Sequence, residues 1–331
     1  MIMRKTDLSL TRKPADTMIQ YLVIMLDDTS VSFCHYVNRR NERRLMPLYT
    51  LKAGILYGMK ENLNIQFVYP DYDLPDEYNK VIEAIDHSKI KPAGKQDGAD
   101  VVVVEGLDEA QTVSPESGKV YVLRTDKTGL FGRYDTVVRL FEHADRLNVV
   151  MIDVETFTED DFTKYKDVLT ALASGVEKMY VEGRSPQLNI LTDRMVLGQM
   201  NNCGAGDTTI TLAPDGCFYV CPAFYQQDGG SAVGSLKAGL DIKNRQLYRL
   251  DHAPLCRKCD AYQCRRCVWL NRKTTLEVNT PSHEQCVVAH LERNASRGLM
   301  AAIRQHGTFL PDCKEIREID YLDPFDVREE W

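Results

Sequence analysis

The sequence of 331 residues has no apolar run approaching the roughly 18 residues of a membrane-spanning helix. Residues 1–5 lack the apolar core of a secretory signal, so we predict a cytoplasmic protein that does not act at a membrane. With 20 glycines and 13 prolines, and with no repeat or low-complexity segment, the chain is neither fibrous nor broadly disordered. Its length suggests two domains, or one large domain with an appendage.

The sequence also lacks an excess of positive charge. A formal net charge of −7 argues against a general nucleic-acid binder, although basic residues at 39–44 and 257–266 keep this as a third class that we do not favour. No glycine-rich phosphate loop follows a predicted strand, because Gly204-Ala-Gly206 precedes a strand and has the wrong spacing. No Ser/His/Asp or Cys/His arrangement stands out either.

What the sequence does have is ten cysteines. In a reducing cytosol these indicate metal ligands or catalytic thiols rather than structural disulfides. Eight of them fall between Cys203 and Cys286, while Cys34 precedes this region and Cys313 follows it. The composition therefore changes near residue 200, where we place a domain boundary.

Between residues 18 and 200, short apolar runs alternate with helical stretches. We predict strands at 21–26, 65–69, 101–104, 119–123, 149–154 and 178–181. We predict helices at 45–62, 75–86, 131–147 and 159–173. Such alternation favours an α/β fold, a parallel sheet covered by helices. About six such units suit a partial (β/α)6 barrel or an open sheet better than a closed eight-fold barrel.

This pattern divides the chain into four parts. They are an N-terminal extension (1–17), the barrel (18–200), a cysteine-rich domain with a C-terminal helix (201–306) and an acidic tail (307–331). Residues 311–331 carry eight acidic and three basic residues, so they account for most of the net charge. We expect both ends to be solvated extensions. Met18, directly before the first apolar run, is an alternative start to Met1.

Charged residues mark the predicted strand ends, where chemistry sits in such folds. These residues are Asp27, Asp28, Asp71, Asp73, Glu105, Arg124, Asp153, Glu155 and Glu182. An acidic rim of this kind would hold a basic peptide or polarise a substrate. The alternative, which we favour, is that these are solvated loop acids.

The strongest local signal is Cys256-Arg-Lys-Cys259-Asp-Ala-Tyr-Gln-Cys264-Arg-Arg-Cys267. Two Cys-x-x-Cys pairs put four thiols in a twelve-residue loop, and the basic residues inside both pairs would help to hold thiolates deprotonated. This pattern indicates a metal or a cluster. Zinc ribbons separate their pairs by about 15–20 residues, so the compact run favours iron–sulfur ligation, with zinc remaining open.

Further cysteines flank this run. Two strand-like segments around Pro214-Asp-Gly216 predict a β-hairpin. Along a strand Cys217 and Cys221 would lie about 13 Å apart, so we keep Cys221 as a ligand and treat Cys217 as a packed or free thiol. Ser282 looks like a helix N-cap with Gln285 at the capping-box position, in a helix that runs to about residue 305. Cys286 would then lie in the first turns of this helix, where the helix dipole favours a thiolate.

These spacings resemble the SPASM domain of radical S-adenosylmethionine enzymes. The family pattern is Cys, 9–15 residues, Gly, four residues, Cys, then Cys-x2-Cys-x5-Cys-x3-Cys and a last Cys; this chain is one residue shorter in each of the last two spacings. The resemblance implies two auxiliary 4Fe–4S clusters. One would take Cys203, Cys221 and Cys267, with its fourth position open or filled unusually. The other would take Cys256, Cys259, Cys264 and Cys286.

The upstream region resembles the partial (β/α)6 barrel of the same enzymes, but it lacks their reactive-cluster motif. That motif is Cys-x3-Cys-x2-Cys, whereas this chain has Cys34, Asn38 and Asn41. The glycine-rich turn that grips S-adenosylmethionine is also missing after residues 65–69. We therefore do not expect S-adenosylmethionine to be bound and cleaved in the usual mode. Cys34 could be a reactive thiol at the barrel mouth, or a structural or incidental cysteine.

Residues 18–305 as a whole resemble the CXXX repeat peptide maturases. The resemblance is carried by Asn202-Cys203-Gly-Ala-Gly206, Cys221-Pro-Ala-Phe-Tyr225 and His290-Leu-Glu-Arg-Asn294. It implies maturation of a short ribosomally made peptide with cysteine at every fourth position. The protein would modify this precursor itself or present it to a separate radical S-adenosylmethionine enzyme. The alternative is a non-catalytic protein-interaction module whose fold is stabilised by zinc or a cluster, and which presents a substrate to a partner enzyme.

Overall fold

The computed structural model describes residues 19–227 and 231–325. The extension predicted for residues 1–17, and with it the question of the start residue, lies outside this range. No helix in the described part of the chain is long and apolar enough to cross a membrane.

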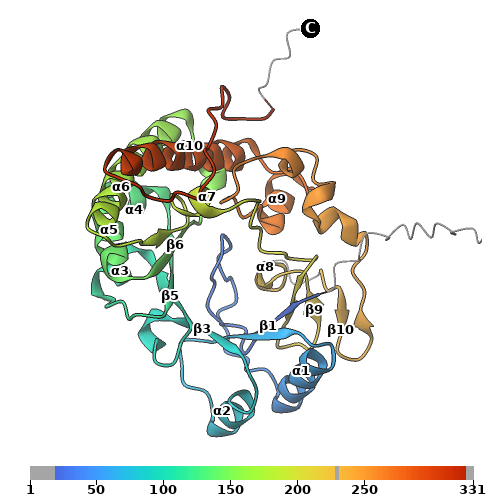
Figure 1. Ribbon diagram of the computed structural model, residues 1–331. Coiled ribbons are helices and arrows are strands. Elements are labelled where there is room, and N and C mark those ends of the chain that lie inside the picture. Colours follow the sequence, from blue (N-terminus) through green and yellow to red (C-terminus); the bar gives the residue numbers. More distant parts are fainter. Residues whose placement is uncertain (1–18, 228–230, 326–331) are drawn as a thin grey trace, which may run out of the picture.

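One curved sheet organises the molecule (Figure 1). Its order is β7-β6-β5-β4-β3-β2-β1-β8-β9, and all neighbours are parallel except the β8–β9 pair. The strands are β1 (Tyr21–Met25), β2 (Asn64–Val68), β3 (Ser88–Pro92), β4 (Val101–Glu105), β5 (Val120–Thr125), β6 (Arg146–Met151), β7 (Gln187–Leu188), β8 (Thr209–Leu212) and β9 (Phe218–Tyr219). The α/β fold with a partial barrel is thus confirmed.

Helices cover the outside of this sheet (Figure 1). They are α1 (Leu48–Lys60), α2 (Asp76–Ile82), α3 (Gly106–Thr112), α4 (Lys127–Gly132), α5 (Tyr134–His143), α6 (Glu159–Val181) and the short α7 (Asp193–Val196). Helix α6 begins at a capping box in which the Thr158 hydroxyl accepts from the backbone N–H of Asp161 and the Asp161 carboxylate accepts from that of Thr158. Two short 3-10 turns, η1 (Ala93–Lys95) and η2 (Val154–Thr156), complete this region.

Two elements differ from the sequence prediction. Residues 178–181, predicted as a strand, form the last turn of α6, because the buried Met179 and Tyr180 continue its apolar face. Strand β3 was not predicted, because only Ile90 of its five residues is buried. It is followed by η1 in place of a covering helix.

The C-terminal region adds β8 and β9 to the sheet, and its last helix packs against α6. The predicted hairpin is confirmed, with Thr211 paired to Tyr219 in β8 and β9. The elements that follow are α8 (Pro222–Gln226), β10 (Gly234–Ser235), β11 (Gly239–Leu240), η3 (Arg245–Tyr248), η4 (Leu250–His252), η5 (Cys256–Lys258), α9 (Val268–Thr275) and α10 (His283–Gln305). The Ser282 cap is confirmed as well, since its hydroxyl accepts from the Gln285 N–H at 3.4 Å.

The residues after α10 are partly packed rather than simply solvated. Ile316 and Asp323 are buried, and the Asp323 carboxylate pairs with His283 at the start of α10. Arg304 in α10 donates to the backbone oxygens of Leu310 and Cys313. Most of residues 307–325 are exposed as expected, but Ile316 and Asp323 depart from the expectation because they are buried.

The loop after β1, residues 26–47, stands inside the curve of the sheet (Figure 1). Arg124 at the end of β5 holds it there. Its buried guanidinium donates to the backbone oxygens of Ser32 (3.2 Å), Cys34 (3.0 Å) and Tyr36 (2.6 Å) and pairs with Glu105 at 2.8 Å. The loop is thus a fixed part of the barrel interior.

Arg124→Met should lower the free energy of unfolding by about 3 kcal/mol, since it leaves the backbone oxygens of Ser32, Cys34 and Tyr36 without their buried donor. Arg133→Met, which removes an exposed ion pair with Asp108, should change it by less than about 1 kcal/mol. Chemical denaturation followed by circular dichroism measures both variants. Equal stability of the two would contradict the role given to Arg124.

Candidate functional site

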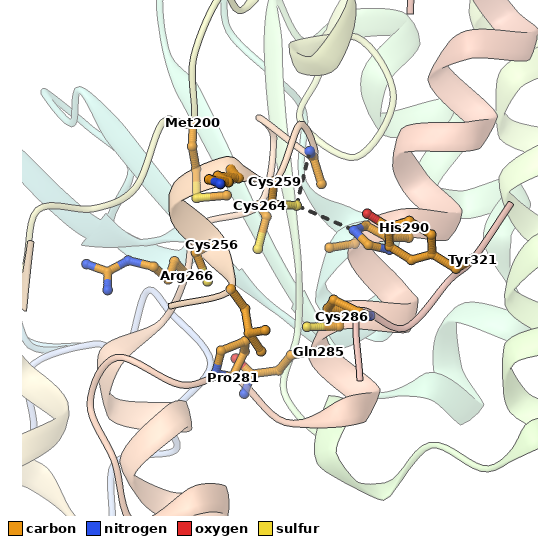
Figure 2. A pocket seen from close by; sticks show the side chains of 15 residues that line it. Met200, Cys256, Cys259, Cys264, Arg266, Pro281, Gln285, Cys286, His290 and Tyr321 are labelled. Atoms are coloured by element: carbon orange, nitrogen blue, oxygen red, sulfur yellow. Dashed lines mark hydrogen bonds between the residues drawn. The ribbon is translucent and has the colours of Figure 1, made fainter. Parts of the chain in front are cut away.

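Four of the predicted ligands line one cavity of about 100 Å³. We call it the second site; its cysteines are Cys256, Cys259, Cys264 and Cys286. Figure 2 shows their sulfur atoms around a common space. Cys256 opens η5, Cys286 lies in the first turns of α10, and the other two come from the loop between η5 and α9. The fold therefore gathers residues separated by up to 30 positions in the sequence.

These thiols lie in an environment that disfavours a free thiolate. Burial raises the pKa of Cys256 to about 11 and that of Cys264 to about 12. Burial also raises the pKa of Cys286. Without an added positive charge in the cavity, the thiols hold their protons at neutral pH. The Cys259 sulfur lies 3.4 Å from His290 Nε2 and accepts from the Ala261 N–H at 3.4 Å.

Unpartnered donors also border this cavity. Arg266 is 3% exposed, and its Nε and Nη1 have no hydrogen-bond partner among the described residues, nor does Gln285 Nε2. The Arg266 Nη2 atom donates to the backbone oxygen of Tyr248. Arg257 and Lys258, which the sequence suggested as thiolate partners, are exposed. The cavity thus combines four thiols with a buried guanidinium whose charge favours a thiolate at Cys256, although this group points away from the four sulfur atoms (Figure 2).

No three His, Cys, Asp or Glu side chains in the described ranges converge closely enough to hold a single metal ion. A tetrahedral zinc site has Zn–S bonds of about 2.3 Å, so its sulfurs lie within about 4 Å of one another. The four thiols are instead arranged around a space. A set of four thiols can hold either an iron–sulfur cluster or zinc.

The three other predicted ligands belong to a separate group, the first site. Cys221 and Cys267 directly precede α8 and α9, and Cys203 lies in the turn before β8. Burial raises the pKa of Cys221, and the neighbouring thiols of Cys267 and Cys203 act in the same direction. Burial and Cys203 likewise raise the pKa of Cys267. The three residues are therefore brought together from segments spread over 65 positions.

A glycine shapes the wall of the first site. Gly206 has a φ of +78°, and a Cβ there would lie 2.6 Å from the Tyr248 ring. Glycine is therefore required for both the backbone conformation and the close approach of this ring. Cys217 is not among the neighbours of the three ligands: its N–H donates to Asp215 at 2.9 Å, and it bridges to Ser235.

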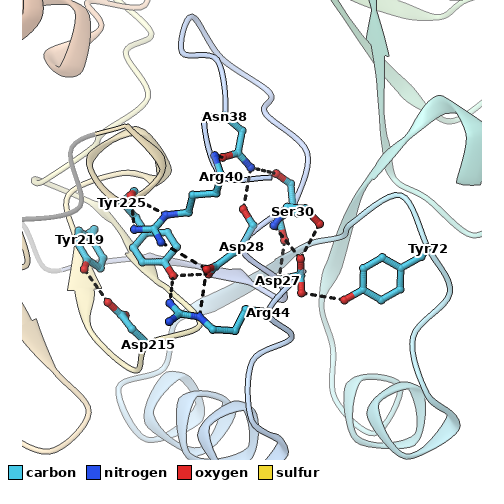
Figure 3. Close-up of polar contacts among 11 residues, drawn as sticks. Asp27, Asp28, Ser30, Asn38, Arg40, Arg44, Tyr72, Asp215, Tyr219 and Tyr225 are labelled. Carbon is cyan, nitrogen blue, oxygen red and sulfur yellow. Dashed lines mark hydrogen bonds and ion pairs between the residues drawn. The ribbon is translucent and has the colours of Figure 1, made fainter. Parts of the chain in front are cut away.

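A polar network ties the loop after β1 to α8 (Figure 3). Buried Asp28 pairs with Arg40 at 3.4 Å and with Arg44 at 3.1 Å, and it accepts a hydrogen bond from the Tyr225 hydroxyl. Arg40 also donates to the Tyr225 backbone oxygen at 3.0 Å and stacks over the Tyr225 ring at 3.8 Å. Sequence reasoning missed Tyr225, Arg40 and Arg44 as a unit, because no local pattern links them.

Asn38 stands where the reactive-cluster motif would have its second cysteine, and its side chain is used to fold the loop. Its amide nitrogen donates to the backbone oxygens of Asp28 (2.8 Å) and Ser30 (3.2 Å). Its amide oxygen accepts from the Arg40 N–H at 2.9 Å. Cys34 lies in the same loop, half-buried, and burial raises its pKa to about 12.

The predicted acidic rim does not form one surface. Asp27 and Asp28 are buried and hydrogen-bonded, whereas Asp71 and Asp73 are exposed and pair with Arg43 and Lys95. Glu182 ends α6 instead of following a strand. The solvated alternative therefore fits Asp71 and Asp73 and is wrong for Asp27 and Asp28.

Buried Glu292 in α10 links the second site to α6. It accepts from the Tyr165 hydroxyl at 2.8 Å and from Gln263, beside Cys264, at 3.4 Å. Burial raises the pKa of this carboxyl to about 7, more than the two hydrogen bonds lower it. Glu292 is therefore largely protonated in the folded protein below neutral pH.

No protein-family model matches the chain, and no curated protein matches it in sequence. Solved structures do match in shape. Native anSMEcpe with bound AdoMet is similar over 86% of this chain and 99% of its own, with a TM-score of 0.56 and 12% identity. Native anSMEcpe with bound AdoMet and Cp18Cys peptide gives a TM-score of 0.56 and 12% identity over 87% of this chain and 99% of its own. The likeness shows that this chain shares the fold of anSMEcpe.

Glu292→Gln should remove a pH dependence of stability. The wild-type carboxyl has a folded pKa of about 7 against an unfolded value of 4.5. Its stabilising contribution is thus complete below pH 4.5 and is lost as the pH rises to about 7, a change of about 3 kcal/mol. The variant should gain stability relative to wild type over this window, measured as unfolding midpoints between pH 5 and 8. Exposed Glu142→Gln is the control, and a pH-independent difference for Glu292→Gln would contradict the assignment.

Proposed function

We propose that this protein matures a short ribosomally made peptide with cysteine at every fourth position, using two 4Fe–4S clusters held in its C-terminal region. It modifies the precursor itself or presents it to a separate radical S-adenosylmethionine enzyme. The observation that carries the proposal is the second site, where four thiols line one cavity. The cytoplasmic location remains part of the proposal.

The ligand sets follow the SPASM-like spacing. Cys256, Cys259, Cys264 and Cys286 would hold the cluster of the second site. Cys203, Cys221 and Cys267 would hold that of the first. Bound clusters supply electron transfer. The chain would hold the thiolates of these clusters. The charge of Arg266 favours the thiolate of Cys256, and the Ala261 N–H donates a hydrogen bond to the Cys259 sulfur.

The alternative, a zinc-stapled interaction module, has weaker support. Zinc ribbons separate their cysteine pairs by about 15–20 residues, whereas the two pairs here are four residues apart, a compact spacing that is more typical of iron–sulfur ligation.

The loop after β1 supports a departure from the usual radical mechanism. Asn38 uses both ends of its amide group to hold the loop, and a neutral amide is a poor ligand for iron–sulfur iron. We therefore propose that S-adenosylmethionine is not cleaved at this loop. A peptide substrate fits the fold, because the similarly folded anSMEcpe has been seen with a peptide, Cp18Cys.

Anaerobically purified protein should contain about eight irons and a matching amount of sulfide per chain, with iron–sulfur absorbance. Cys264→Ala should lose up to about four of these irons and lower the thermal unfolding midpoint, because cluster binding contributes to folding. Cys217→Ala is the matched control and should keep its iron. Stoichiometric zinc without sulfide would establish the alternative instead.

A synthetic peptide with cysteine at every fourth position should bind the loaded protein more tightly than the same peptide with serine in those positions. The expected difference is about tenfold or more, because only thiols offer the chemistry to be matured. Fluorescence anisotropy measured anaerobically with both peptides tests this. Equal binding of the two would contradict a role specific for cysteine-repeat precursors.

A further inference from the structure

The first site has three cysteines in the C-terminal region, and a four-iron cluster takes four protein ligands when it is fully coordinated. A fourth cysteine lies beside them. Cys34, Cys221 and Cys267 are partly buried against the same hydrophobic core, and the Cys34 loop contacts the segments that follow Cys221 and Cys267. Cys34 and Cys203 come from loops more than 160 positions apart, so the grouping is invisible in the sequence.

The backbone of Cys34 is held in place from the barrel side. Arg124 fixes this segment, since it donates to the backbone oxygens of Ser32, Cys34 and Tyr36. The neighbouring His35 contacts the backbone oxygen of Met151, at the end of β6, through Nδ1 at 2.7 Å. Cys34 therefore presents its thiol from a fixed position.

The same loop packs against both helices that follow first-site ligands. The Tyr36 ring contacts Trp269, two residues after Cys267, edge-to-face at 6.3 Å. Gln226, at the end of the short helix that follows Cys221, donates to the backbone oxygen of Ser30 at 2.9 Å. These contacts join the Cys34 loop to the two segments that carry the ligands.

We propose that Cys34 supplies the fourth thiolate ligand of the first site, an inference that rests on the cluster chemistry proposed above. Cys34, which stands at the first position of the reactive-cluster motif, is then a ligand of an auxiliary cluster and not of a radical cluster. Arg265, which lies beside Cys34 and 3.4 Å from Asn148, offers a positive charge to the added thiolate. With four thiolates the first site has no open iron for a substrate thiol, so its role is electron transfer or support of the fold.

Cys34→Ala tests this ligand role by iron analysis and electron paramagnetic resonance of the anaerobic protein. The expected result is a loss of between about one and four irons per chain, with a three-iron signal if the cluster survives incompletely. Cys313→Ala, which removes another half-buried cysteine, should keep the wild-type iron content and spectrum. Unchanged iron and spectra in Cys34→Ala would overturn the inference while leaving the proposed function standing. A wild-type protein without iron and sulfide would overturn both.

A second measurement needs no variant and so does not depend on folding. In loaded wild-type protein Cys34 should resist iodoacetamide, and removal of the clusters by a chelator should raise its labelling several-fold, as read by peptide mass spectrometry. Cys313 should label equally in both samples. Equal labelling of Cys34 before and after chelation would also overturn the ligand role.

Discussion

The buried guanidinium of Arg124 is the constraint on which the interior of the barrel depends. A charge in this position is costly unless every donor finds a partner, and here the partners are three backbone oxygens of one loop and the Glu105 carboxylate. The loop cannot move away without leaving the buried charge of Arg124 unpaired. Residues 32–36 are therefore as fixed as the strands around them, and Cys34 takes its position from this requirement.

The same loop explains why this fold is not expected to carry the usual radical chemistry. A loop that holds a reactive cluster presents three thiolates to one metal site. Here Asn38 turns inward to the backbone oxygens of Asp28 and Ser30, and Asp28 is neutralised by Arg40 and Arg44. The loop is stabilised by its own polar contacts and has no need of a metal for its shape. This chain thus shares the fold of anSMEcpe, while polar side-chain contacts hold its β1 loop.

Sequence reasoning succeeded where the determinants are local. The Pro-Asp-Gly turn, the Ser282 cap and the alternation of strands and helices each depend on neighbouring residues. It failed at β3, whose Ser-Lys-Ile-Lys-Pro sequence has one buried side chain, and at the end of α6, where an apolar helical turn resembles a strand. The contacts of Arg124 and the Asp28–Tyr225 hydrogen bond join residues about 90 and 197 positions apart, beyond any pattern.

The two cysteine groups differ in what they connect. All four cysteines of the second site belong to the C-terminal region, and the site is linked to α6 through Gln263, Glu292 and Tyr165. The first site is bordered by the β1 loop, and the contacts of Tyr36 with Trp269 and of Gln226 with Ser30 run between the barrel and that region. Because the free energy of metal binding adds to folding, a cluster shared across this boundary fixes the two parts against each other. With Cys34 as the proposed fourth ligand, the β1 loop would couple the barrel to the C-terminal region.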